Sequence, residues 1–395
     1  MKRTAPLAFL LIIATSCAVP TPITTVSPTI ELTPTIVITP TIVSTEKPTS
    51  LPKEPPVSIK CDQTSTFTTE VSTTIDIFAA NQRLKHTINL GEALEFADKG
   101  NWKWVDNEEI FYVVANVGFT AVRVPVNFAS HAMSIPPYSI KDSFWESVDS
   151  IVDKAMKCGL VVIVNMHNFG SESQIPYDEG EYFLALWYQI AEHYQNYPET
   201  GLYFELYNEP GDPDFWNTRL FQGISAVRKS NPTRPIIIGL ADWSQPSGLS
   251  ALKLPNDKNL IVSFHYYEPM EFTHQGADWI NGAYAWLGTT WDATPDQIAV
   301  INQDFDRISN WAQNRRQPVP IFLGEFGSLS KANQDSRVRW TAAVRQAAEE
   351  HGFSWAYWDL CTTGTFTFGI FSCPKFPATT GKWEEDLFNA LIPRQ

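Results

Sequence analysis

Short apolar runs alternate with longer amphipathic segments along most of the chain, and this alternation is the feature that most constrains its fold. From residue 83 onward there are eight such runs, each followed by helical spacing of apolar residues or by a short helical stretch. The runs are nearly continuous in apolar residues, which is typical of parallel strands buried on both faces. Eight consecutive strand–helix units predict an α/β fold, the closed (β/α)8 TIM barrel. We expect the strands at residues 86–90, 121–126, 161–167, 202–209, 235–240, 260–267, 320–325 and 353–360.

The segments between these runs carry helix start and stop signals. The first helix is expected to begin at Asp106 as N-cap, with Glu109 completing a capping box, and to stop at Gly118. An open, doubly wound sheet is the alternative fold. No Gly-x-Gly-x-x-Gly motif follows any strand, which argues against a dinucleotide-binding sheet. The other helices are expected at residues 143–158, 182–194, 215–229, 296–314, 336–351 and 383–391.

The N-terminal part of the chain does not have this alternation. Residues 1–17 have a basic start, a short apolar run and small residues before Cys17, which indicates a secretory signal. Cys17 stands as in a bacterial lipobox, so we expect it to be lipidated, with ordinary signal cleavage nearby as the alternative. Residues 18–60 are rich in Thr and Pro and predict a disordered, extended linker. The barrel domain would then be residues 61–395, secreted or held at the cell surface.

Charge narrows the range of partners. The chain has 29 Lys and Arg against 43 Asp and Glu, a formal net charge of −14. A nucleic-acid-binding protein needs a basic face, so nucleic acid is not expected as a partner. No stretch after the signal has the pattern of a membrane span, which limits membrane contact to the lipid anchor. A neutral substrate is compatible with this charge balance. We also expect the protein to be a monomer.

Four cysteines follow Cys17. Four cysteines allow three pairings in an exported protein. We expect Cys361 to pair with Cys373, because the two bracket a Gly- and Thr-rich loop. Cys158 ends a predicted helix and is expected to be a buried apolar residue. The cysteine spacings are not those of a zinc site. No metal or cofactor is expected.

Polar side chains stand at the ends of seven of the eight expected strands. The carboxyl ends of barrel strands share one rim, and that rim carries the chemistry of such folds. A single polar residue there can be structural, but seven strand ends converging on one rim indicate a site. The residues are Glu92, Glu95, Arg123, His167, Asn168, Asn208, Glu209, His265, Tyr266, Tyr267, Glu325, Trp358 and Asp359.

Two of these residues form an opposed pair of carboxyl groups. Glu209 lies in Tyr-Asn-Glu-Pro and Glu325 in Leu-Gly-Glu-Phe-Gly, at the ends of strands four and seven. In a closed barrel these strands face each other across the mouth. One carboxyl can then donate a proton while the other attacks an anomeric carbon, and a retaining mechanism needs the two about 5–5.5 Å apart.

The strand-end motifs of this chain resemble those of glycoside hydrolase family 5, whose members are retaining (β/α)8 enzymes. The motifs follow one another along the chain in the family's order, one per strand. The resemblance extends from Arg83 to Ile392. The segment from Phe272 to Trp279 further resembles a bacterial endoglucanase branch, some members of which also cut mannan. The motifs are Ile-Asn-Leu-Gly at 88–91, Arg123-Val-Pro-Val, His167-Asn168, Asn208-Glu209-Pro210, His265-Tyr-Tyr267, Gly-Glu325-Phe-Gly and Trp358.

The resemblance implies that Glu209 is the acid/base and Glu325 the nucleophile. Arg123 would hold Glu325 ionised, because an adjacent cation lowers the pKa of a carboxyl group. Tyr267 would donate a hydrogen bond to Glu325. The expected roles of the others are a bond from Asn208 to the sugar 2-hydroxyl, support of Glu209 by His265, hydroxyl binding by His167 and a flat sugar platform at Trp358.

Some of the candidate site residues can instead have a purely structural role. His265 can instead be a core histidine bonded to backbone, and Trp358 can be part of the barrel packing. Asp359 and Glu268 are expected to be solvated or hydrogen-bonded groups of the rim. Further candidates for glycan contact are Asn168, Trp243, His131 and Glu95, with Trp279 and Trp286 in the loop after strand six.

One residue departs from the family pattern. The family has Leu-Gly-Asn after strand one, where this chain has Leu90-Gly91-Glu92. An amide both donates and accepts hydrogen bonds, whereas an ionised carboxylate only accepts. The substitution affects the expected binding at the non-reducing side of the cleft and leaves the carboxyl pair unchanged.

The leading hypothesis is an exported endo-β-1,4-glucanase acting on a cellulose-like polysaccharide. The alternative is a β-mannanase or a dual glucan/mannan hydrolase, since glucose and mannose differ only in the orientation of the C2 hydroxyl. A non-catalytic glycan-binding barrel would be expected to lack one of the two carboxylates, and both are present. A metal-dependent hydrolase is disfavoured by the absence of ligand spacing.

Overall fold

The computed structural model describes residues 61, 67, 75–95, 107–168, 179–361, 367–373 and 381–393. These residues all belong to one compact unit of the chain. The expected signal over residues 1–17, its Cys17 and the linker over residues 18–60 lie outside the described residues.

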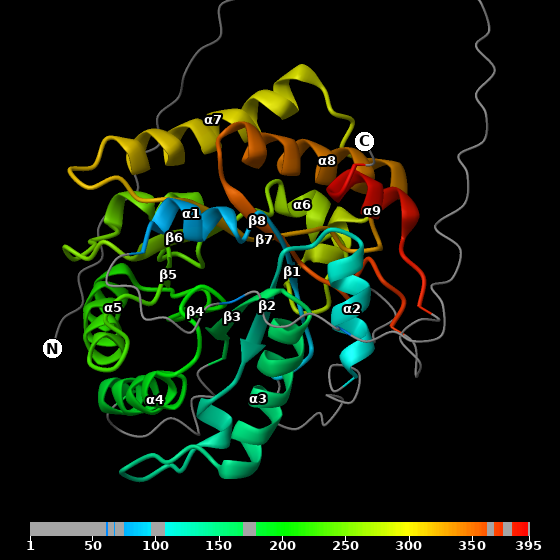
Figure 1. Ribbon diagram of the computed structural model, residues 1–395. Helices are drawn as coiled ribbons and strands as arrows, with labels where there is room; N and C mark the ends of the chain where they lie inside the picture. Colours follow the sequence, from blue (N-terminus) through cyan, green and yellow to red (C-terminus); the bar gives the residue numbers. More distant parts are fainter. Residues whose placement is uncertain are drawn as a thin grey trace, which may run out of the picture. The chain divides into compact units, whose positions relative to one another are not determined.

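Eight parallel strands close into a barrel in which each strand pairs with the next and β8 pairs with β1 (Figure 1). This confirms the predicted (β/α)8 fold. The fourth strand is shorter than expected, because it ends at Glu205 and leaves Glu209 in the loop that follows. The strands are β1 His86–Asn89, β2 Ala121–Val126, β3 Val161–Met166, β4 Leu202–Glu205, β5 Ile236–Gly239, β6 Leu260–His265, β7 Ile321–Phe326 and β8 Ser354–Tyr357.

Helices surround the barrel and return the chain from the end of one strand to the start of the next (Figure 1). The start expected for the first of these was wrong by one residue: the N-cap is Asn107, whose Oδ1 accepts the N–H of Glu109. Across the described residues, no helix is both long and apolar enough to traverse a bilayer. The larger helices are α2 Glu108–Asn116, α3 Asp142–Lys157, α4 Glu179–His193, α5 Pro213–Arg228, α7 Pro295–Gln313, α8 Gln334–Glu350 and α9 Glu385–Leu391.

Shorter elements complete the fold. Helix α1, Ile77–Gln82, lies against the strand starts, where the amide of Asn81 donates to the carbonyl of Ile321 at 2.9 Å. The Tyr203 hydroxyl also donates to the carbonyl of Ala80, at 3.2 Å. These bonds tie the helix to the N-terminal end of the barrel. The others are η2 Ala129–His131, η3 Pro246–Ala251, α6 Met270–Thr273 and η4 Ala283–Trp286.

The core lies on both faces of the sheet. Every residue of β2, β3, β6 and β7 is buried, because side chains fill the barrel interior and the helices cover its outside. Most of these residues are Val, Ile, Leu and Phe, which pack into a pleated surface well. The exceptions include buried polar residues, and several of these lie near the carboxyl ends of the strands.

Two disulfides link described residues. Cys361 pairs with Cys373, twelve residues apart, as the sequence led us to expect. Cys158, expected to be a buried apolar thiol, is instead bonded to Cys61 at a sequence separation of 97. The prediction for Cys158 was wrong because pairing depends on spatial approach, here a Cα–Cα distance of 4.8 Å, which the sequence does not reveal.

Candidate active site

The carboxyl ends of β4, β6 and β7 bring together Glu209, His265 and Glu325. Glu325 lies within β7 and is buried, whereas Glu209 lies four positions beyond β4 with a left-handed φ of 49°. One oxygen of each carboxylate and Nδ1 of His265 all lie within 4.8 Å of one another. This close approach agrees with the separation of about 5–5.5 Å between the two carboxyl groups of retaining glycosidases.

Glu325 is held at both oxygens. Nη1 of Arg123 donates to Oε1 at 2.7 Å, and the hydroxyl of Tyr267 donates to Oε2 at 2.8 Å. Burial raises the pKa of Glu325, while the charges of His265 and Arg123 oppose the rise. The lowering expected from Arg123 is therefore present but is outweighed by burial. The two donors fix the orientation of the carboxylate.

His265 connects the two carboxylates. Its Nδ1 lies 2.8 Å from Oε1 of Glu209 and 3.6 Å from Oε2 of Glu325. Although burial acts to lower the pKa of His265, the Glu325 charge and the bond to Glu209 raise it above its ordinary value. The ring is only 2% exposed. Its partners are carboxylates rather than backbone groups, which argues against the alternative of an ordinary core histidine.

Arg123 is a fully buried cation at the base of the site. Nε and Nη2 donate to the two oxygens of Glu205 at 2.6 and 3.0 Å. Nη1 also donates to Oδ1 of Asn89 at 2.9 Å, and Nη2 to Oδ1 of Asn208 at 2.8 Å. The sequence analysis missed Glu205, and it named Asn89 only as part of the motif at 88–91, without a role. The available signal was a charged residue at the end of an apolar strand, Leu-Tyr-Phe-Glu.

His167 and Trp358 lie face to face at the rim. Their ring centroids are 5.5 Å apart with an interplanar angle of 11°, and both side chains are half-buried. Nδ1 of His167 lies 3.0 Å from Oδ1 of Asn165. Burial, together with the charges of Arg123 and His265, lowers the pKa of His167 well below its ordinary value. A neutral imidazole can both donate and accept, which suits a hydroxyl-binding role.

The acidic residues after β1 and β8 are more deeply buried than expected. Asp359, expected to be a solvated or hydrogen-bonded rim group, has no exposed area, and neither of its oxygens has a hydrogen-bond partner among the described residues. That expectation was wrong because Asp359 packs over Gly91, where a Cβ would lie 2.1 Å from Oδ2. Burial raises the pKa of Asp359 well above its ordinary value.

Glu95 is buried beside this acid. Its side chain is 2% exposed, Oε1 accepts the backbone N–H of Glu92 at 2.6 Å, and burial raises its pKa to about 8. Its carbonyl accepts from Asn168 at 2.9 Å and from Asn127 at 3.1 Å. The structure thus places Glu95 beneath the surface, where it supports Asn168. Glu92 itself is half-buried with a left-handed φ of 58°.

The remaining candidates lie farther out. Trp243 follows β5 and is 61% exposed, and Trp279 in the β6 loop is 66% exposed. Trp286 is partly buried against the small apolar cluster that includes Phe368. His131 stacks on Phe144 with centroids 3.9 Å apart, so it packs against α3. These positions do not touch the carboxylate pair in any contact found among the described residues.

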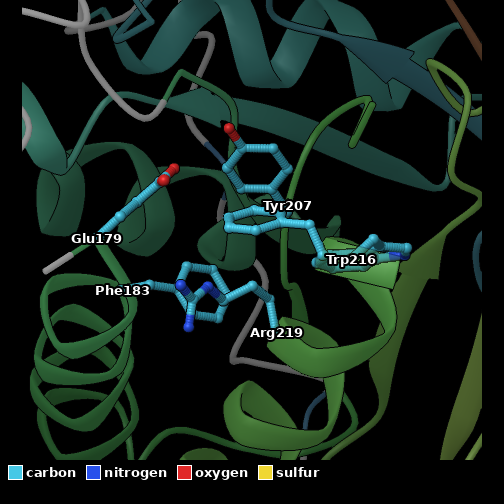
Figure 2. A pocket seen from close by; sticks show the side chains of 6 residues that line it. Glu179, Phe183, Tyr207, Trp216 and Arg219 are labelled. Carbon is cyan, nitrogen blue, oxygen red and sulfur yellow. The ribbon is translucent and has the colours of Figure 1, made fainter. Parts of the chain in front are cut away.

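A small aromatic pocket lies between α4 and α5, beside the loop that carries Glu209 (Figure 2). Its volume is about 10 Å³, which is too small for a sugar ring. Tyr207 packs there against Trp216 and Phe183, with centroids 6.0 and 6.3 Å apart. The pocket therefore supports the backbone just before Glu209 and is not a substrate site.

The trio of Glu209, His265 and Glu325 is also the one cluster of metal-type ligands within the described parts of the chain. Each of its ligand atoms already bonds to or lies near another protein group, including the Arg123 cation. A positive guanidinium beside a carboxylate opposes cation binding there. The arrangement suits proton transfer and nucleophilic attack.

Comparison with known proteins identifies the family of the chain. The family model for Cellulase (glycosyl hydrolase family 5) matches residues 87–364. Endoglucanase H of Acetivibrio thermocellus is 34% identical over 335 residues, which cover 83% of this chain and 35% of that protein. The chain thus matches about a third of that relative's length. Endoglucanase A of Ruminococcus albus is 28% identical over 329 residues, covering 74% of this chain and 87% of that protein.

Solved structures similar to this chain also include endoglucanases. A structure described as an endoglucanase has 40% identity and a TM-score of 0.74, covering 80% of this chain and all of that one. Thermotoga maritima Cel5A has 39% identity, the same TM-score and the same coverage, and has been solved in complex with cellobiose and with mannotriose. The chain belongs to the cellulase family, glycosyl hydrolase family 5.

Proposed function

We propose that this protein is a retaining, endo-acting glycoside hydrolase that cleaves β-1,4-linked glucan by double displacement. The observation that most supports the mechanism is the approach of Glu209 and Glu325, with carboxylate oxygens within 4.8 Å. An inverting pair stands about 6.5–9.5 Å apart to admit a water. The endoglucanase names of the relatives favour glucan over mannan as the substrate.

In the first displacement, a Glu325 oxygen attacks the anomeric carbon while Glu209 gives its proton to the departing glycosidic oxygen. The bond from the anomeric carbon to the leaving oxygen breaks as the bond to Glu325 forms. Arg123 and Tyr267 donate to Glu325 and keep it aimed at the sugar. The developing negative charge on the leaving oxygen is neutralised by the proton from Glu209.

In the second displacement, Glu209 acts as the general base instead of the general acid. Glu209, now a carboxylate, takes a proton from a water, and the water oxygen bonds to the anomeric carbon as Glu325 leaves. Nδ1 of His265, 2.8 Å from Oε1 of Glu209, would hold this carboxyl group in place in both steps. Two inversions at one carbon give overall retention, so the first product has the β configuration.

Neighbouring residues would bind the sugar. Because Oδ1 of Asn208 accepts from Arg123, the amide NH₂ of Asn208 is the group left for the 2-hydroxyl. His167 covers one face of Trp358, which leaves the other face for a sugar ring. Asn168 and the exposed Trp243 are proposed as outer glycan contacts, with His131 and Glu95 acting through neighbouring residues.

We further propose that the protein is exported and works as a monomer at the cell surface, attached through Cys17. The lipobox-like sequence supports attachment, and the linker at residues 18–60 would hold the domain away from the membrane. Metabolic labelling with radioactive palmitate would test this. Label in the native chain and none in Cys17→Ser is expected, and an unlabelled native chain would contradict attachment.

The mechanism is tested with Glu325→Ala. Hydrolysis of carboxymethylcellulose and mixed-linked glucan should fall at least 10⁴-fold, while glycan binding and the melting temperature stay near native values. Azide should restore turnover of an activated aryl cellobioside by forming the α-glycosyl azide. Glu268→Ala, a matched exposed carboxylate after β6, should behave like the native enzyme.

Two further measurements complete the test. Proton NMR of the first product from the native enzyme should show the β anomer, and an initial α anomer would refute retention. Parallel assays on glucan and mannan test the substrate. Turnover of mannan that exceeds that of both glucans would contradict the glucanase assignment.

A further inference from the structure

We propose that Glu205, a carboxylate that touches no substrate, is a positioning residue of the reaction that locks Arg123 in place and balances its charge, so that Glu325 stays strongly nucleophilic. The inference rests on the proposed role of Glu325 as nucleophile. Glu205 ends β4 and is 1% exposed, and Arg123 in β2 has no exposed area. The pair therefore meets in the closed interior of the barrel.

The contact is a two-point fork. Nε of Arg123 donates to Oε2 of Glu205 at 2.6 Å, and Nη2 donates to Oε1 at 3.0 Å. A bidentate pair of this kind fixes the plane of the guanidinium as well as its position. Because both partners are buried, water does not weaken the attraction as it does at a surface.

The fork determines where the other donors of Arg123 point. A guanidinium has five N–H groups in one plane. Glu205 accepts two of them, and the remaining three go to Asn89, Glu325 and Asn208 at 2.9, 2.7 and 2.8 Å. Every donor is used, so the group cannot rotate without breaking bonds. Glu205 thereby sets the donor that orients the nucleophile and the donor that orients Asn208.

The charge of Glu205 has a separate effect. Arg123 is shared between two carboxylates, Glu205 and Glu325. Without the charge of Glu205, the ionised form of Glu325 would lose a like charge nearby and gain the full attraction of the cation. Both changes lower the pKa of Glu325 and make it a weaker nucleophile. Besides Glu205, the titratable groups that act on Glu325 are Arg123, Glu209, His265 and Tyr267, with Glu95 and Asp359.

The test is the pH profile of kcat/KM for Glu205→Gln, which keeps the shape of the side chain and removes its charge. With an aryl cellobioside, the acid limb should move to lower pH by about 0.5–1 unit. The plateau kcat should fall about 10- to 100-fold, with KM changed less than about threefold. Glu205→Asp, which keeps the charge but shortens the reach, should lose kcat and leave the acid limb in place.

The matched control is Asp257→Asn. Asp257 forms the same two-point fork with Arg228, at 2.7 and 3.1 Å, just before β6 begins at the opposite end of the strands. This variant should lose thermal stability and keep the native pH profile. If Glu205→Gln lowers stability to a similar degree and leaves the acid limb unmoved, Glu205 is structural only and the proposal fails.

Two further measurements cover a Glu205→Gln variant that does not fold and a wrong assignment of Glu325 as nucleophile. If Glu205→Gln does not fold, Glu205→Asp decides, because a native kcat in that variant would overturn the positioning role. Covalent trapping with a 2-deoxy-2-fluoro cellobioside, followed by peptide mass analysis, tests Glu325 independently. A label elsewhere than Glu325 would refute the proposed mechanism, whereas a label on Glu325 with no shift in the variant would refute only the inference.

Discussion

The buried acid Glu95 should make the protein less stable as the pH rises, and Glu95→Gln should remove this loss. Burial raises the pKa of Glu95 from 4.5 to about 8 in the native state. Between these values the unfolded carboxyl group has lost its proton while the native one retains it. The native state then binds more protons, so the free energy of unfolding falls as pH increases through this window.

The magnitude follows from the two pKa values. Within this window, each pH unit lowers the free energy of unfolding by about 1.4 kcal/mol. From pH 4.5 to pH 8 the free energy of unfolding therefore falls by about 5 kcal/mol. The stability that the protonated acid contributes is complete below pH 4.5 and is gone above pH 8. Glutamine has the same shape, keeps an acceptor for the N–H of Glu92 and does not ionise.

Urea unfolding of the oxidised protein at pH 5, 6, 7 and 8 measures the effect. At pH 5 the native protein and Glu95→Gln should agree within about 1 kcal/mol, and at pH 8 the variant should be more stable by several kcal/mol. Glu146→Gln, at an exposed position on α3, should follow the native curve. Parallel curves for the native protein and Glu95→Gln would refute the reasoning.

Three other predictions concern single contacts. Tyr267→Phe removes the donor to Oε2 of Glu325 and should lower kcat about 10²-fold in steady-state assays. An effect on KM alone would contradict this prediction. Replacing Cys61 and Cys158 with Ala opens a loop that the disulfide closes across 97 positions, and it should lower the free energy of unfolding by about 5 kcal/mol. Guanidinium unfolding without reductant measures the change. An unchanged midpoint would show that the disulfide does not contribute to stability. Trp358→Ala should weaken cellotetraose binding, measured calorimetrically in inactive Glu325→Ala, by about 2 kcal/mol, and unaltered affinity would remove Trp358 from the platform role.

The architecture could be predicted because its signals are local. Continuous apolar runs such as Val161–Met166 and the amphipathic segments between them define the order of strands and helices. Eight such units leave few folds to consider. The ends of the strands are not encoded in this way. The run after Leu202 continues to Glu209 in the sequence, but the strand ends at Glu205, where pairing with β5 stops.

The candidate site could be predicted only in part. The sequence singled out Glu209 and Glu325 because each stands in a distinctive motif at a strand end. It did not reveal Glu205, which looks like an ordinary charge in a short strand, or the burial of Asp359 against Gly91. Those properties depend on what lies across the barrel, and no pattern of neighbouring residues encodes it.

By itself, the sequence determined the succession of elements, the closed barrel and the identity of the two acidic residues at its mouth, since periodicity and motifs are properties of adjacent residues. Only the tertiary structure decided the electrostatic setting of those acids. Arg123 meets Glu205 across 82 positions and Glu325 across 202. Burial and charge act through space, so the protonation and aim of Glu325 are established only when the barrel closes.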